Sequence, residues 1–377
     1  MQGFSYLPKV GIVSTYAPTV CGLATFSAAL AGGLSTRGVD VRIVRIADDV
    51  PSADRDVVGE IVQGSAPSIA AACALLNRND VAVIQHEYGI YGGPDGDEVV
   101  ELMKGLTVPS IVVAHTVLKD PTAHQHSVLD EILALADHVV VMSEAARRRL
   151  CDGFAVARRK VSIIPHGAAL PVGVALKRSG RPTILTWGLL GPGKGVERVI
   201  DAMPALKDLP QRPRYLIAGR THPKVFAAQG EAYRDGLVAQ AQRLGVADSV
   251  FFDAAYRTQK QLTELMQAAA VVVLPYDSKD QVTSGVLVDS VAGGRPIIAT
   301  AFPHAIELLG TGAGTVVGHD DPDALTRALR RTLTNPRAAG TMASEARGLA
   351  PAMAWPVVAN AYVVLAQRLV AERLAAA

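Results

Sequence analysis

Short apolar segments alternate with longer segments of helical periodicity along most of the chain. Segments such as DEVVELMKGL and QKQLTELMQAA place their apolar residues at helical spacing. The Val/Ile-rich runs between such segments are typical of strands covered on both faces of a parallel sheet. These runs are KVGIVST (9–15), VRIVRIA (41–47), VAVIQHE (81–87), SIVVAHT (110–116), HVVVMS (138–143), VSIIPHG (161–167), TILTWG (183–188), YLIAGR (215–220), VFFDA (250–254), VVVLPY (271–276), PIIATA (296–301) and GTVVGH (314–319).

The alternation predicts an α/β fold made of two doubly wound, Rossmann-like domains. A stretch without periodicity, PHGAALPVGVALKRSGRP (165–182), separates the two series of strands and is interpreted as a linker. We therefore expect an N-terminal domain over 1–168 and a C-terminal domain over 182–355. The last apolar helix, about 356–377, is expected to pack back on the first domain rather than lie on a membrane surface.

Composition and charge exclude several classes of protein. The chain has 377 residues, 49% hydrophobic and 19% charged, which excludes a disordered chain and allows two buried cores. A formal net charge of +2 gives no reason to expect nucleic acid as the main partner. The three cysteines lie far apart, and no signal peptide or uninterrupted apolar run of 18 residues is recognised. A cytoplasmic enzyme is the resulting expectation.

The loop GLLGPGKG (188–195) carries the first candidate chemistry. It has the G-x-x-x-x-G-K spacing of a nucleotide-binding P-loop between a predicted strand and helix. Gly195 replaces the hydroxyl residue that would hold magnesium, and Pro192 also argues against ATP hydrolysis. A glycine-rich turn that opens onto a helix presents backbone amides to an anion, and Lys194 adds a full charge. We interpret Lys194 as a phosphate contact, with a purely structural turn as the alternative.

The segment DSKDQVTSGVLVDSVAGGRP (277–296) is the second candidate. Ser284 is a good helix N-cap, and Gly285 allows a ligand to approach the backbone amides. Asp289 falls about one turn into the predicted helix, where its carboxylate could accept hydrogen bonds from two adjacent hydroxyls, as in ribose. A capped core helix without a ligand is an equally good interpretation of these residues alone.

Taken in order, GLLGPGKGVERVIDAM, YLIAGR and VVVLPY…SGVLVDSVAGGRPIIAT resemble the C-terminal domain of the retaining glycosyltransferases of family four. YAPTVCGLATFSAAL, VVAHTV and VSIIPHGA resemble that family's N-terminal half, although His166 stands where the family usually has Asn. The resemblance implies the GT-B architecture, in which two Rossmann-like domains face each other across a cleft. It implies a retaining hexosyltransferase that moves a hexose from a nucleotide-sugar donor to a carbohydrate or other hydroxyl acceptor, without a metal or other cofactor.

The sequence departs from the family at three positions. Leu189 stands where the family has an arginine that binds the donor diphosphate. Gln281 and Asp289 stand at the two positions of the family's Glu-x7-Glu signature, which contact the donor sugar and the ribose. Losing an arginine–phosphate contact costs on the order of 1.5–3 kcal/mol unless another group replaces it. Arg220 is our candidate replacement, with a solvated surface arginine as the alternative.

The resemblance and the strand ends together define the predicted site. His115 and Lys194 are the predicted catalytic residues, although a buried core histidine is an alternative for His115. His86 and Glu87 are predicted to bind the acceptor, and a structural role for Glu87 remains open. The donor phosphates are assigned to Gly22, Lys194, Arg220, Ser284, Gly285 and Val286, and the donor sugar and ribose to Gln281 and Asp289.

Other functions remain possible at this point. A glycoside phosphorylase of the same fold would use inorganic phosphate, and the changes at 189 and 281 favour it. A non-catalytic sugar- or nucleotide-binding protein is more distant, as are an epimerase and a P-loop NTPase. The donor sugar, its base, the acceptor and the oligomeric state cannot be derived from the sequence.

Overall fold

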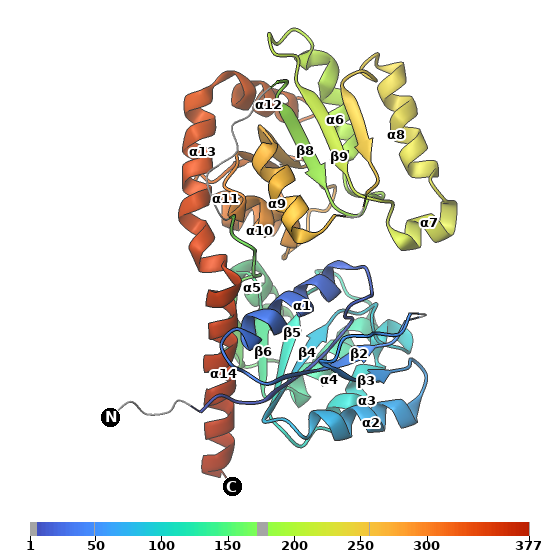
Figure 1. The fold of residues 1–377 in the computed structure, drawn as a ribbon, viewed down its shortest axis with the longest axis vertical. Coiled ribbons are helices and arrows are strands. Elements are labelled where there is room, and N and C mark those ends of the chain that lie inside the picture. Colours follow the sequence, from blue (N-terminus) through green and yellow to red (C-terminus); the bar gives the residue numbers. More distant parts are fainter. Residues whose placement is uncertain (1–5, 49, 172–179, 256, 377) are drawn as a thin grey trace. The chain divides into compact units, whose positions relative to one another are not determined.

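The computed structural model describes residues 6–48, 50–171, 180–255 and 257–376. The chain divides into two compact units (Figure 1). The N-terminal unit comprises Met1–Gly167 and Trp355–Ala377, and the C-terminal unit comprises Ala168–Ala354. The segment expected to be a linker spans 165–182, of which 172–179 lie outside the described residues.

The N-terminal unit is built on a seven-stranded parallel sheet of order β3-β2-β1-β4-β5-β6-β7. Six of its strands coincide with predicted runs, but β3 at the edge was missed. The strands are β1 (Val10–Ser14), β2 (Val41–Ile46), β3 (Val57–Ile61), β4 (Val81–His86), β5 (Ser110–Ala114), β6 (His138–Val141) and β7 (Val161–Ile163). The helices are α1 (Gly22–Ser35), α2 (Ala66–Leu76), α3 (Glu98–Lys104), α4 (Ala123–Leu135), α5 (Glu144–Gly153) and α14 (Trp355–Ala376), with 3₁₀ turns at Pro94–Gly96 and Arg158–Lys160.

Helix α14 completes one hydrophobic layer of the N-terminal unit. Its Val358, Tyr362 and Leu369 share one core cluster with Phe26 and Leu30 of α1 and with residues of five strands. Figure 1 shows α14 running alongside the unit, and contacts between α1 and α14 place the two helices side by side. The helix packs on the N-terminal unit because one of its faces is apolar and is buried there.

The C-terminal unit has a six-stranded parallel sheet of order β10-β9-β8-β11-β12-β13. Its strands are β8 (Thr183–Trp187), β9 (Arg214–Ala218), β10 (Val250–Asp253), β11 (Val271–Leu274), β12 (Ile297–Thr300) and β13 (Thr315–Val317). Its helices are α6 (Val196–Ala202), α7 (Pro223–Gln229), α8 (Ala232–Arg243), α9 (Gln259–Ala268), α10 (Gly285–Ala292), α11 (Pro303–Leu309), α12 (Ala324–Thr334) and α13 (Pro336–Leu349), with 3₁₀ turns at Met203–Leu206 and Ala350–Met353.

Helices cover both faces of this second sheet. Successive strand residues Ile184 and Leu185 belong to different core clusters, one with α6, α8 and α12 and the other with α9, α10, α11 and α13. This arrangement explains why the strands have continuous apolar runs instead of alternating ones. The predicted fold class, two doubly wound α/β domains, is confirmed for each unit.

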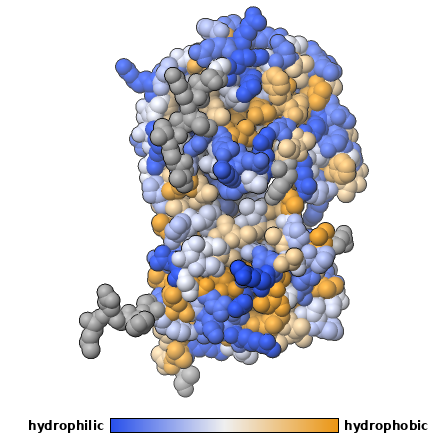
Figure 2. Space-filling view, in the orientation of Figure 1, coloured by the Kyte–Doolittle hydropathy of each residue, from blue (hydrophilic) through white to orange (hydrophobic). Residues whose placement is uncertain are grey.

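The surface carries a mixture of residue types. On the face drawn in Figure 2, hydrophilic and hydrophobic residues are interspersed over both units. Within the described ranges, we find no helix whose length and apolar content would let it cross a bilayer.

Candidate functional site

Each sheet has one point where the strand order reverses, and ligands of open α/β sheets bind beyond the strand ends at such points. In the N-terminal unit the point lies between β1 and β4, and in the C-terminal unit between β8 and β11. The loops that follow these four strands, together with the first turns of the helices they lead into, contain most of the predicted site residues. The topology therefore gives each unit one preferred ligand position.

In the C-terminal unit, the loops after β8 and β11 touch through their backbones. Gly195 has φ 64°, and a Cβ atom there would lie 1.7 Å from the carbonyl oxygen of Pro275. A Cβ atom on Gly219, which has φ 148°, would lie 1.9 Å from the carbonyl oxygen of Gly188. Only glycine fits such approaches and such dihedral angles. The glycines of this region therefore bring three loops together at the switch point.

Lys194 stands directly at this junction. Its Nζ lies 4.6 Å from the ring centroid of Tyr276, the second residue after β11. The Gly193 carbonyl also accepts a hydrogen bond from the Asp277 amide at 3.0 Å, which ties the two loops together. The ring of Tyr276 is buried, so it offers the ammonium a fixed cation–π support that leaves its charge available to an anion. Sequence reasoning missed Tyr276, although its place at the end of a buried strand was a signal.

The amino terminus of α10 forms the other side of this junction. Ser284 is its N-cap, and the Ser284 Oγ accepts a hydrogen bond from the Leu287 amide at 3.2 Å. The Ser284 amide donates to Nδ1 of buried His304 at 2.9 Å. The predicted phosphate contacts Gly285 and Val286 begin the helix, where amides have no partner within the helix. Such a terminus attracts negative charge.

Asp289 lies in the next turn of α10, in a poorly solvated position. Burial raises the pKa of Asp289 to about 7, and a distant hydrogen bond from Gln259 Nε2, at 3.5 Å, only partly offsets this. Gln281, the other position of the signature, donates from its Nε2 to the Thr283 carbonyl at 2.9 Å. Gln281 thus stabilises its own loop, whereas Asp289 lacks a strong stabilising contact for its charge.

Arg220 lies in the loop that follows β9, beside the loop that follows β8. The Leu190 amide donates to the Arg220 carbonyl at 2.8 Å, and the His222 amide donates to the Leu190 carbonyl at 2.8 Å. This pairing places the Arg220 backbone next to Leu189, where the family arginine would stand. The position is compatible with the predicted replacement, which stays a prediction.

In the N-terminal unit, the predicted residues meet at the ends of β4 and β5. His115 Nε2 lies 2.6 Å from Gln85 Oε1, and the His115 amide donates to the His86 carbonyl at 3.1 Å. The imidazole of His115 and the carboxamide of Gln85 thus share a short hydrogen bond. Burial, together with nearby His166 and His86, lowers the pKa of His115 to about 3. His115 is therefore a neutral imidazole, suited to hydrogen bonding rather than to carrying charge.

Glu87 is oriented by its neighbours. Its carboxylate accepts hydrogen bonds from the Thr116 hydroxyl and from the Tyr88 amide, the latter at 3.1 Å. The preceding residue, His86, is only 1% exposed, and burial lowers the pKa of His86 to about 4. The structure brings Glu87 and His115 to neighbouring strand ends, while His86 belongs to the buried layer. Gln85 was missed, although it is a polar residue within a predicted buried strand.

Gly22 begins α1 at the switch point of the N-terminal unit. Cys21 is the N-cap, and its Sγ accepts a hydrogen bond from the Ala24 amide at 3.3 Å. A Cβ atom on Gly22 would meet nothing within 4 Å, so internal packing does not require glycine there. The position is open to a ligand. Among the described residues there is no group of three or more His, Cys, Asp or Glu side chains that could hold a metal ion.

Comparison with known proteins adds independent information. The family model described as "Glycosyl transferases group 1" matches residues 173–348, and "Glycosyltransferase Family 4" matches residues 20–170. A D-inositol 3-phosphate glycosyltransferase of Kineococcus radiotolerans is 27% identical over 267 residues, which are 65% of this chain and 60% of the relative. The chain thus spans about three fifths of the length of that curated relative.

Two solved structures show the fold. Sucrose-phosphate synthase from Thermosynechococcus elongatus superposes with a TM-score of 0.77 at 20% identity, covering 97% of this chain and 100% of the other. HepE of Anabaena in complex with UDP gives a TM-score of 0.71 at 18% identity, covering 98% and 100%. Matches over nearly the full length of both chains extend the fold similarity to both units.

Proposed function

The chain belongs to the glycosyltransferases of the family-four type, with GT-B architecture, and from this premise we propose that it is a retaining hexosyltransferase that uses a nucleotide-sugar donor. The donor diphosphate binds in the C-terminal unit, at the switch point between β8 and β11. The acceptor, a carbohydrate or another hydroxyl compound, binds at the strand ends of the N-terminal unit. The protein needs no metal and acts in the cytoplasm.

One observation carries the proposal: the Lys194 ammonium rests on the Tyr276 ring beside loops that the backbone holds together. Negative charge grows on the leaving phosphate as the glycosidic bond breaks. A fixed cation and the amides that open α10 stabilise this charge without having to reorganise. Asp289 lies one turn further along α10, and its carboxylate accepts hydrogen bonds from the ribose hydroxyls.

The reaction keeps the configuration of the sugar when the acceptor attacks the face from which the nucleotide leaves. The leaving phosphate then takes the acceptor proton, so no protein nucleophile is required. Glu87, held by Thr116, accepts a hydrogen bond from an acceptor hydroxyl, and neutral His115 contacts the donor sugar. HepE of Anabaena binds UDP in its solved complex, which supports a nucleotide donor for this chain as well.

Calorimetric titration with UDP, GDP, ADP and inorganic phosphate tests the donor site. We expect one nucleotide to bind, and Lys194→Gln to weaken it about 10- to 100-fold, the effect of losing a charge-assisted hydrogen bond. Lys224→Gln, which removes an exposed ammonium from α7, is the matched control and should change nothing. The anomeric configuration of the product, read by NMR, tests retention, and turnover in EDTA tests metal independence.

Two results would contradict the proposal. Tight binding of inorganic phosphate without any nucleotide binding would favour a glycoside phosphorylase, in line with Leu189 and Gln281. Nucleotide binding that is unaffected by Lys194→Gln would show that the Lys194 ammonium does not contact the donor.

A further inference from the structure

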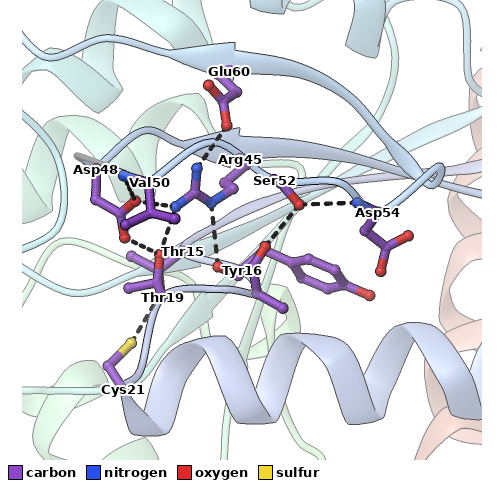
Figure 3. A network of polar contacts seen from close by, with 11 residues as sticks. Thr15, Tyr16, Thr19, Cys21, Arg45, Asp48, Val50, Ser52, Asp54 and Glu60 are labelled. Atoms are coloured by element: carbon purple, nitrogen blue, oxygen red, sulfur yellow. Dashed lines mark hydrogen bonds and ion pairs between the residues drawn. The ribbon is translucent and has the colours of Figure 1, made fainter.

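A buried arginine outside the predicted site organises the loop at the switch point of the N-terminal unit. Arg45 lies on β2, and its side chain is 0% exposed. Figure 3 shows its guanidinium among polar groups of the loop after β1, the segment after β2 and strand β3. Burying a guanidinium has a large desolvation free energy unless its N–H groups find acceptors and a negative group balances its charge.

Two of its contacts reach the loop between β1 and α1. Arg45 Nε donates to the Tyr16 carbonyl at 3.2 Å, and Nη2 donates to Thr19 Oγ1 at 2.9 Å. The Thr19 amide also donates to the Tyr16 carbonyl at 3.0 Å, which closes a tight turn. Both ends of this turn are thus fixed to the same planar group.

Two carboxylates on the other side balance the charge. Arg45 Nη1 donates to Glu60 Oε1 at 2.6 Å, and Nη2 also contacts Asp48 Oδ1. The second oxygen of Asp48 accepts the Thr19 hydroxyl, so Thr19 joins the loop to both members of the ion pair. Although burial acts against it, the hydrogen bonds that Arg45 donates to Asp48 and Glu60 raise the pKa of Arg45. Lysine cannot reproduce this pattern, because it lacks the planar array of donors.

The same loop leads directly into the predicted ligand contact. Thr15 Oγ1 lies 3.3 Å from Sγ of Cys21, the N-cap of α1, and Ser52 Oγ donates to the Ala17 carbonyl at 2.8 Å. The first contact joins the two ends of the loop to each other, and the second joins the loop to the segment after β2 (Figure 3). Gly22, which follows Cys21, therefore receives its position from a loop whose turn is held by Arg45.

We propose that Arg45 is a positioning residue for the reaction: through Thr19 and the Tyr16 carbonyl, it holds the β1–α1 loop so that the Gly22 amide meets the substrate. The proposal rests on the proposed function, because it assumes that Gly22 contacts the donor. Arg45 itself does not touch substrate. Its role is to keep the backbone of this loop ordered in the conformation that presents Gly22.

Thr19→Val tests the proposal while the buried Arg45 keeps its ion pairs with Asp48 and Glu60. It removes the hydroxyl that joins the loop to Arg45 and Asp48, whereas Thr19→Ser keeps it. Thr36→Val, which removes a hydroxyl that donates to the Gly33 carbonyl at the other end of α1, is the matched control. We measure amide hydrogen exchange over residues 16–22, kcat and KM for the donor, and UDP affinity.

We expect Thr19→Val to speed exchange over residues 16–22 at least tenfold and to lower kcat about tenfold, the order of effect of a misplaced contact. UDP affinity should fall by no more than about tenfold, because Gly22 is one of several groups assigned to the donor phosphates. Thr19→Ser should restore both quantities, and Thr36→Val should leave them unchanged. Arg45→Lys should reproduce the Thr19→Val effects.

Other outcomes overturn the proposal in distinguishable ways. Faster exchange with unchanged kcat and KM would make the Arg45 cluster purely structural. Unchanged exchange would show that Arg45 does not hold the loop. If the wild-type protein binds no nucleotide, the proposed function itself fails, and this proposal fails with it whatever the exchange data show.

Discussion

Replacing Asp289 by asparagine should make the free protein more stable and its complex with the donor weaker. Burial raises the pKa of Asp289 from 3.8 to about 7, which corresponds to about 4 kcal/mol between its charged and neutral forms. Because the folded-state pKa lies above the unfolded-state value, this cost is absent below about pH 4. The cost grows as the pH rises and is complete above about pH 7.

The asparagine side chain carries no charge at any pH. The gain in free energy of unfolding from Asp289→Asn should therefore depend on pH. We expect the free energy of unfolding to rise by up to about 4 kcal/mol at pH 8 and to change little at pH 4. Urea denaturation of the ligand-free protein at both pH values measures this difference. Asp201→Asn is the control, because Asp201 is an exposed carboxylate that also accepts a hydrogen bond from a glutamine side chain, at 2.6 Å from Gln240.

Binding should show the opposite effect. Ribose hydroxyls donate to the ionised carboxylate, so a pKa of about 7 predicts roughly tenfold weaker binding at pH 6 than at pH 8. A nucleotide sugar such as UDP-glucose is the suitable ligand, since its diphosphate does not titrate in this range. Asp289→Asn should bind about tenfold more weakly at pH 8 and lose the pH dependence. Wild-type affinity that is flat between pH 6 and 8, or an asparagine variant no more stable at pH 8, would refute the reasoning.

Two further changes test other parts of the structure. Gly195→Ala should cost at least about 2 kcal/mol of unfolding free energy, because its Cβ would lie 1.7 Å from the Pro275 carbonyl oxygen. Gly193→Ala, at φ 87° but with nothing within 4 Å, should cost only about 1 kcal/mol, and equal losses in urea denaturation would contradict the close approach. Burial, Arg368 and Lys160 lower the pKa of His138 to about 4, so its contribution to stability is complete above about pH 6.5 and declines as the pH falls toward 4. Between pH 6.5 and 4.5, wild type should lose about 2 kcal/mol more than His138→Gln in the same assay, and parallel losses would contradict the shift.

The strand pattern was the strongest information in the sequence. Twelve runs predicted strands, and each overlaps one, because strands covered on both faces need continuous apolar residues. Strand β3 was not predicted because it lies at the sheet edge, where Glu60 and a glycine interrupt the apolar run. A Cβ atom on that glycine, Gly59, would lie 2.4 Å from Cδ1 of Leu75, so a larger residue there would require the Leu75 side chain to move.

The sequence did not show which residues from distant segments meet in the folded structure. Arg42 and Arg45 share one predicted strand, yet Arg42 is exposed beside Asp40 and Arg45 is fully buried. The distinction depends on Glu60, a residue of the missed strand. Lys194 was singled out by its spacing, but the ring that supports it follows a strand much further along the chain, and no local pattern reveals that pairing.

Helix α14 has a consequence for biosynthesis. The N-terminal unit needs Trp355–Ala376 to cover Phe26 and Leu30, yet these residues leave the ribosome long after the rest of that unit. All of Ala168–Ala354 has been synthesised by then. The second unit can therefore finish folding during translation, whereas the first keeps an uncovered apolar layer until α14 has emerged from the ribosome, a period in which a chaperone could bind it.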